Sequence, residues 1–311
     1  MGEQSLMNSN AIKKIGLIIG DEQDWPEAVL NTINQQDGFS AELVKLGATF
    51  MDSPVTYDLI IDRISHEIPY YRAFLKYAVS QGVYIINNPF TWSADSRFFG
   101  IALVNKLGLT SPRTAVLPNK EVEMDAKPSS FRNLRYPMKW QEIIDYVGVP
   151  AIFKDIHSGG RRPVHRVTNV DELLQRYDES GTRTTILQQI IESDIHIHCF
   201  VFGQENVLAL RYSLKDGRYL PESVSPDDPT YQHLSQSALT LSQVYKYDIN
   251  MVEFVIQDDT TYVINGTNPA PVIDRQLMTD EQFNWCVQES VNAALERAKQ
   301  PLAQQPVSLN R

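Results

Sequence analysis

The order of strand-like and helix-like segments predicts a mixed fold, in which a small parallel α/β domain precedes a larger α+β region. Short buried strands alternate with helices up to about residue 92, and this alternation is typical of a parallel sheet covered by helices on both faces. Beyond it, apolar strands at 185–191, 195–202 and 206–212 follow one another closely. The last two are joined at Gly203-Gln204-Glu205, which is typical of an antiparallel hairpin.

The first region contains four expected strands and two expected helices. Its strands are expected at 13–20, 41–46, 57–63 and 83–87, and its helices at 25–35 and 69–81. Pro26 suits the first turn of a helix. No G-x-G-x-x-G sequence follows the first strand, which speaks against a dinucleotide site there.

The later regions contain longer helices and paired strands. Helices are expected at 94–107, 140–146, 171–177, 230–246 and 280–299, and further strands at 149–155, 251–257 and 261–264, while 110–117 leads into the next region. Gly108 is a typical stop for the first of these helices, and Asn169 or Thr168 is available as an N-cap. Residues 118–137 show no period, which is typical of a lid or an insertion.

These elements predict three domains between two flexible tails. We expect an N-terminal α/β domain at 11–92, a central lobe at 93–184 and a C-terminal lobe at 185–300, with tails at 1–10 and 301–311.

Composition excludes several classes of function. The 311 residues carry a formal charge of −10, whereas binding to a nucleic-acid backbone needs a basic face. No apolar run is long enough to span a bilayer, and residues 1–10 lack the apolar centre of a secretory signal. Cys199 and Cys286 show no metal-ligand spacing and are expected to be buried, reduced thiols. We therefore expect a cytoplasmic protein without a nucleic-acid or membrane partner.

A lysine at the end of a buried strand is the first candidate for chemistry. Lys154 is followed by Gly159 and Gly160 and by two arginines. A lysine can place a charge on a phosphate, while glycines let backbone N–H groups approach the phosphate oxygens. The alternative is an exposed hairpin with incidental charges.

The strand that ends near residue 191 is a candidate nucleotide hinge. Backbone groups there could read a base edge, and an acidic side chain beyond them, Asp194, could hold ribose hydroxyls. The candidate hinge residues are Gln188, Gln189, Ile190 and Ile191. Any strand that ends in polar residues has a similar pattern.

Two further segments could supply a cation and metal ligands. Arg211 ends an otherwise apolar strand and could face a transferring phosphoryl group; the alternative is a surface arginine. Glu253, with Asn265 or Asn268 on the paired strand, could converge on Mg²⁺, which prefers oxygen ligands. His196 and His198 share a strand face, but without a third ligand they are expected to be structural.

In order and spacing these segments resemble the ATP-grasp superfamily. The resemblance is greatest to the branch of glutathione synthetases and of ligases that add glutamate to ribosomal proteins, and it covers about 85–299. The matching segments are Asn87-Asn88-Pro89, the strand lysine Lys154, the hinge 188–191, the segment Asp194–Gly203, Arg211, and the segment from Glu253 to Pro271. The resemblance implies a two-lobed ATP-grasp fold after the N-terminal domain.

The resemblance also implies an activity. It implies that ATP and Mg²⁺ are cofactors in the ligation of a carboxylate to an amine through an acyl phosphate. The substrates would be small molecules or peptides, and Arg63, at the end of a strand of the first domain, could grip a substrate carboxylate. A homodimer is one expected state.

The chain departs from the family pattern at positions that matter for catalysis. Arg97 stands at the family's first phosphate lysine, and Asn265 or Gly266 stands at a metal-binding glutamate. Two alternatives to a ligase follow: an ATP-grasp protein that binds nucleotide without turnover, or a small-molecule kinase of the same fold.

Overall fold

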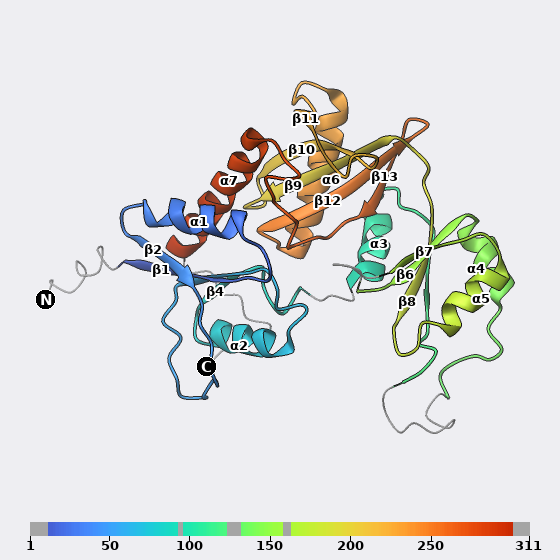
Figure 1. Ribbon diagram of the computed structural model, residues 1–311, viewed down its shortest axis with the longest axis horizontal. Helices are drawn as coiled ribbons and strands as arrows, with labels where there is room; N and C mark the ends of the chain where they lie inside the picture. The colour runs from blue at the N-terminus through green and yellow to red at the C-terminus, as the bar shows by residue number, and fades with distance from the viewer. Residues whose placement is uncertain (1–11, 93–95, 123–131, 158–162, 301–311) are drawn as a thin grey trace, which may run out of the picture. The chain divides into compact units, whose positions relative to one another are not determined.

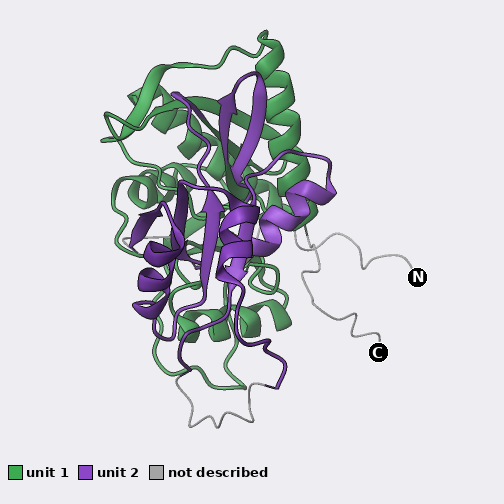
Figure 2. Cartoon of the chain, turned by 90° about the vertical axis from the view of Figure 1, so that its right-hand side faces the viewer, with its two compact units in different colours: residues 1–93, 197–252, 267–311 green, residues 94–196, 253–266 purple. Residues whose placement is uncertain are grey.

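A computed structural model describes residues 12–92, 96–122, 132–157 and 163–300 (Figure 1). The chain forms two compact units, drawn in green and purple in Figure 2. Unit 1 combines Met1–Ser93, Ile197–Val252 and Thr267–Arg311, and unit 2 combines Ala94–His196 and Glu253–Gly266. The predicted tails and the pair Gly159-Gly160 lie outside the described residues.

A four-stranded parallel sheet forms the first part of unit 1. Its strands are β1 (Lys13–Ile18), β2 (Phe39–Leu43), β3 (Leu59–Asp62) and β4 (Tyr84–Ile86), in the order β2-β1-β3-β4. All three pairings are parallel. The sequence prediction of a small parallel sheet is confirmed.

Helices cover both faces of this sheet. The side chains of Ile15 and Leu17 pack with α1 (Asp24–Asn34) and α7 (Asp280–Lys299) in one cluster. On the other face Ile18 and Ile60 pack with α2 (Pro69–Ser80). This follows from the alternation of side chains along a strand, since a strand that is buried on both faces needs apolar residues at successive positions. The last helix of the chain therefore covers the first sheet.

A second sheet has five strands in the order β11-β10-β9-β12-β13. They are β9 (Ile195–Phe202), β10 (Asn206–Ser213), β11 (Arg218–Ser223), β12 (Ile249–Gln257) and β13 (Thr260–Asn265), and α6 (Pro229–Tyr245) follows β11. The predicted hairpin between β9 and β10 is present, with Gly203 and Gln204 both at positive φ. The sequence did not predict β11, because its segment contains a proline and lacks a clear alternation.

Unit 2 contains a four-stranded antiparallel sheet in the order β5-β8-β6-β7. Its strands are β5 (Thr114–Leu117), β6 (Ala151–Asp155), β7 (Val164–Val167) and β8 (Thr185–Gln189), and its helices are α3 (Ser96–Lys106), α4 (Trp140–Val147) and α5 (Val170–Asp178). Phe153 and Leu187 pack with residues of α4 and α5 in one core. The short strand β7 was not predicted, because two of its four residues are polar.

The two units group the chain differently from the three predicted domains. Residues 185–196 belong to unit 2, and the C-terminal helix belongs to unit 1 with the N-terminal sheet. The three-domain division stays a prediction. Cys199 and Cys286 are free and buried, as expected, and none of the described helices is long and apolar enough to cross a membrane.

The N-cap of α5 gives a test of local stability. The Asn169 side chain accepts a hydrogen bond from the backbone N–H of Glu172, as the sequence predicts for one of its two candidates. Asn169→Ala is expected to destabilise α5 by about 1 kcal/mol, whereas Asn169→Asp keeps an acceptor and should cost little. Hydrogen exchange of the α5 amides measures the difference, and equal exchange in both variants would contradict the assigned cap.

Candidate functional site

Strand β6 presents Lys154 on the face of the sheet opposite to α4 and α5. Along β6, Ala151 and Phe153 are buried in the core with the helices, and Lys154 alternates to the other face, where it is half-buried. Its Nζ donates a hydrogen bond of 2.9 Å to Oε1 of Gln188 on the neighbouring strand β8. Nε2 of Gln188 in turn donates to Oγ1 of Thr114 on β5, at 3.1 Å. Three strands therefore fix the position of the ammonium group.

A second cation and a carboxylate lie within electrostatic range of Lys154. The pKa of Lys154 is lowered to about 8: burial is the largest cause, the Arg97 guanidinium adds to it, and Glu253 opposes both. Burial also lowers the pKa of Arg97, again opposed by Glu253. Arg97 comes from the first turn of α3, Lys154 from β6 and Glu253 from β12. Two cations and one carboxylate thus share a poorly solvated region of unit 2.

The residue opposite Glu253 is Asn265. The β12–β13 register pairs these two residues, with a bulge between Glu253 and Phe254. Nδ2 of Asn265 donates a hydrogen bond of 2.9 Å to Oε1 of Glu253. Which of Asn265 and Gly266 stands at the family's metal-binding glutamate stays a prediction.

The oxygen atoms of Glu253 and Asn265 fit a hard divalent cation. Magnesium is usually held by only one or two carboxylates and completes its shell with water and phosphate oxygens. In the described part of the chain, no group of three or more His, Cys, Asp or Glu side chains could hold a metal by itself. The donor set therefore fits a metal that binds together with a phosphate ligand.

The four residues of the predicted hinge lie partly in strand β8 and partly after its end. Gln188 and Gln189 pair with β6, Gln188 also pairs with β5, and the Gln189 N–H donates to the carbonyl of Arg113. The strand ends there, so Ile190 and Ile191 follow outside the ladder. Asp194 is exposed before β9. The hinge and ribose roles of these residues stay predictions.

Three predicted site residues, Arg63, Arg211 and Asn268, belong to unit 1. Arg211 is exposed on β10. It adds to the lowering of the Asp228 pKa, which comes mainly from the backbone N–H of Thr230. The backbone of Asn268 donates to Oδ1 of Asn250 and accepts from the N–H of Met251, both at 2.9 Å. The phosphoryl-facing role of Arg211 and the metal role of Asn268 stay predictions.

Arg63, the predicted substrate residue, is buried and paired. Its guanidinium forms an ion pair with Glu22, with Nε 3.1 Å from Oε2, and lies 4.5 Å from the ring centroid of Trp25. Nη2 also donates to the carbonyl of Pro271 at 2.5 Å. Arg63 follows β3 and Glu22 follows β1, so the pair lies at the point where the strand order of the parallel sheet reverses. Open α/β sheets bind ligands at this point.

The histidines of β9 have packing partners. The ring of His198 stacks on Tyr212 at 4.8 Å between centroids, and its Nδ1 lies 3.0 Å from the Tyr219 hydroxyl. Nε2 of His196 lies 2.9 Å from the carbonyl of Ser193. These contacts agree with the structural role that we expected for both residues.

Comparisons with known proteins were made on sequence and on structure. A search of protein-family models and a search of curated proteins found no match. Among solved structures, a RimK domain protein ATP-grasp from Sphaerobacter thermophilus DSM 20745 matches with a TM-score of 0.65 at 15% identity, over 91% of this chain and 99% of that one. This chain has the ATP-grasp fold.

Other ATP-grasp structures match over similar lengths. D-alanine–D-alanine ligase from Bacillus anthracis, complexed with ATP, has a TM-score of 0.60 and 12% identity, over 92% of this chain and 97% of that one. The ATP-grasp ligase PsnB, complexed with a phosphomimetic variant of its minimal precursor, Mg and ADP, has a TM-score of 0.61 and 14% identity, over 93% and 99%. The predicted ATP-grasp fold is confirmed, and the branch within the superfamily stays a prediction.

Proposed function

We propose that this protein is an ATP- and Mg²⁺-dependent ligase that joins a carboxylate to an amine. The observation that carries the proposal is the group of Lys154, Arg97 and Glu253, which three separate elements bring into one poorly solvated region. Such a group suits a triphosphate with a divalent cation, because phosphoryl transfer depends mainly on positioning and charge neutralisation. Structural neighbours with ATP, or with Mg and ADP, support the choice.

In this proposal the two cations hold the phosphates. Lys154, kept in place by Gln188, supplies a compact ammonium, and Arg97 supplies a planar guanidinium with several N–H donors. The glycines Gly159 and Gly160 would add backbone N–H groups, and Ile190 and Ile191 would contact the base. Glu253 and Asn265 would hold Mg²⁺, which neutralises charge on the phosphate oxygens.

The chemistry then has two steps. An oxygen of the substrate carboxylate attacks the γ-phosphorus of ATP, which forms an acyl phosphate and releases ADP. The nitrogen of the amine attacks the acyl carbon, phosphate leaves with the bonding electrons, and the ammonium proton passes to a base or to water. Arg211 would stabilise the transferring phosphoryl group. The acyl phosphate must be protected from water until the amine arrives.

The substrates are proposed to be a small molecule or peptide with a carboxylate and an amine acceptor. The guanidinium of Arg63 is paired with Glu22. A substrate carboxylate could bind to Arg63 only by displacing the Glu22 carboxylate from this pair. In this exchange one carboxylate replaces another in the same ion pair. Glu22 would then be free to pair with an ammonium group of the same substrate.

The direct test measures ADP release with magnesium across a panel of amino acids, short peptides and hydroxy acids. A ligase releases ADP only when a carboxylate is present and consumes the amine in equal amount. ADP release without amine consumption would favour the small-molecule kinase. No ADP release across the panel, together with ATP binding, would overturn the ligase.

A second candidate function is nucleotide binding without turnover. Asn265 favours it, since an amide stands opposite Glu253 where a second carboxylate would strengthen a metal site. Calorimetry with ATP separates the two functions. An ATP affinity that does not change with magnesium favours the binding protein. An ATP affinity that magnesium increases by roughly tenfold or more favours the enzyme.

The pKa of Lys154 predicts how ATP binding depends on pH. Because this pKa is about 8 in the nucleotide-free protein, the ammonium form is abundant below pH 8 and is lost above it. ATP affinity is therefore expected to fall by up to about tenfold per pH unit above pH 8. Lys154→Arg should remove this dependence, because arginine stays charged. Titrations between pH 7 and 9.5 measure it, and identical profiles for both proteins would contradict the assignment.

A further inference from the structure

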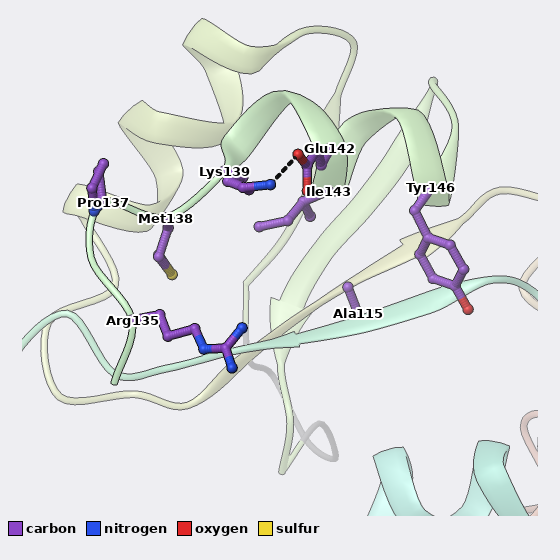
Figure 3. A pocket seen from close by; sticks show the side chains of 8 residues that line it. All are labelled: Ala115, Arg135, Pro137, Met138, Lys139, Glu142, Ile143 and Tyr146. Carbon is purple, nitrogen blue, oxygen red and sulfur yellow. Dashed lines mark hydrogen bonds and ion pairs between the residues drawn. The ribbon is translucent and has the colours of Figure 1, made fainter. Parts of the chain in front are cut away.

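Unit 2 contains a cavity beside α4 that the proposed ligase chemistry does not use. Its volume is about 510 Å³, which lies within the range of ligand pockets. Its apolar part comes from Ala115 of β5, Met138 before α4, and Ile143 of α4, and the ring of Tyr146 borders it (Figure 3). An apolar side chain of moderate size would fit.

This cavity lies on the opposite face of the sheet from Lys154. Ala115, Met138 and Ile143 pack against the core cluster that contains Phe153. Lys154 alternates with Phe153 along β6 and therefore faces away from that core. A ligand in the cavity would not overlap with a nucleotide at Lys154.

The cavity adjoins a free sheet edge. Strand β5 is the first strand in the order β5-β8-β6-β7, and no strand in the described part of the chain pairs with the outer edge of its residues 114–117. The bond from the Gln189 N–H to the Arg113 carbonyl fixes the alternation along β5. The backbone groups of Ala115 therefore face β8, whereas those of Thr114 and Val116 point outward. Val116 is 39% exposed, whereas Thr114 is only 7% exposed, so the accessible part of this edge is at Val116.

The charge around the cavity is positive. Lys139 and Glu142 neutralise each other through an ion pair of 2.6 Å, drawn as a dashed line in Figure 3. The guanidinium of Arg135 lies at the cavity and forms no ion pair or hydrogen bond within the described residues. The net charge of the whole chain does not decide the potential in one cleft. Arg135 thus offers an unpaired cation beside an apolar hollow.

We propose that this cavity and the outer edge of β5 bind an extended acidic peptide segment. The peptide adds a strand beside the exposed Val116, places one apolar side chain over Met138 and Ile143, and directs a carboxylate to Arg135. Strand addition to a free edge uses main-chain hydrogen bonds for affinity and side-chain pockets for specificity. A nucleic acid does not fit, because a single unpaired arginine and an apolar floor suit neither its backbone charge nor its size.

The experiment uses the full chain without nucleotide and a fluorescein-labelled peptide of sequence Ser-Glu-Leu-Glu-Val-Glu-Ser. Fluorescence anisotropy should show saturable binding, and a twin with glutamine in place of glutamate should bind about tenfold more weakly. Arg135→Glu should weaken binding of the acidic peptide by a similar factor. Lys106→Glu, an equal change of charge at the end of α3, should change it less than about twofold.

Two N-methylated twins of the peptide test the strand pairing. In an extended peptide, alternate backbone N–H groups face β5, so methylation in one frame should abolish binding and methylation in the other should preserve it. The proposal is overturned if the two methylated peptides bind equally well. It is also overturned if Arg135→Glu binds the acidic peptide as tightly as the unaltered protein does. Absence of peptide binding overturns it as well and leaves the ATP proposal in place, because the assay contains no nucleotide.

Discussion

Replacing Lys154 by alanine is expected to weaken ATP binding by roughly a hundredfold. A charge-assisted contact to phosphate in a poorly solvated site contributes about 1.5–3 kcal/mol. Lys154 is half-buried, and its ammonium group is held by Gln188, which is in turn held by Thr114. Calorimetric titration of ATP with magnesium at pH 7 measures the loss.

The control for this result is Lys154→Met. The methionine fills the space of the lysine stem without charge, and it should lose ATP binding to the same extent as alanine. The nucleotide-free protein should be no less stable than the unaltered one, because burial already disfavours the charged form of Lys154. Lys120→Ala, at an exposed lysine paired with Asp178, should bind ATP normally. Unchanged affinity in Lys154→Ala would remove this residue from the site.

The local signals of the sequence were sufficient for most of the fold. Short apolar runs such as Ile15–Ile18 predicted the parallel strands, because a strand covered on both faces must be apolar at successive positions. Helix α7 begins and ends at the predicted residues, Asp280 and Lys299. A capping box at Thr279 and Gln282 explains its sharp start.

The sequence could not show which distant segments pack together. Nothing local in α7 indicates that it covers the first sheet, where Ser290 accepts a hydrogen bond of 3.2 Å from Trp25. The pairing of Arg63 with Glu22 joins two strand ends that are 41 positions apart. Each residue alone looks like a surface charge.

In the candidate site, too, the sequence predicts individual residues but not their long-range contacts. Lys154 was predicted because a lysine stands at the end of a buried strand, and Arg97 because the family resemblance, counted back from Gly108, places it at a phosphate-binding lysine. The support of Lys154 by Gln188 and Thr114 could not be found, since it depends on the order β5-β8-β6. The partner of Glu253 depended on a bulge, which shifts the register by one residue and leaves no clear sequence signal.

Glu253→Gln is expected to remove most of the effect of magnesium on ATP binding. The glutamine keeps the size and the polarity of the side chain, and it removes the carboxylate that the proposal assigns to the metal. Magnesium should strengthen ATP binding to the unaltered protein by roughly tenfold or more, and to the variant by less than about threefold. Titration of ATP with excess magnesium and with excess chelator measures both factors.

The same substitution should have the opposite effect without metal. Glu253 now places a negative charge near Lys154 and Arg97, where it repels an incoming triphosphate. Glu253→Gln should therefore bind metal-free ATP as tightly as the unaltered protein, or up to about threefold more tightly. Partial misfolding of the variant cannot produce this pattern, because misfolding weakens ATP binding both with and without metal.

Asn265→Asp is the matched variant that should act in the other direction. A second carboxylate opposite Glu253 would strengthen the metal site and would repel phosphate in the absence of metal. Magnesium should then increase ATP affinity by a larger factor than in the unaltered protein. If Glu253→Gln kept the full magnesium effect while Asn265→Asp left it unchanged, the metal would bind elsewhere, because the two strands that meet at Glu253 and Asn265 would contribute no ligand to it.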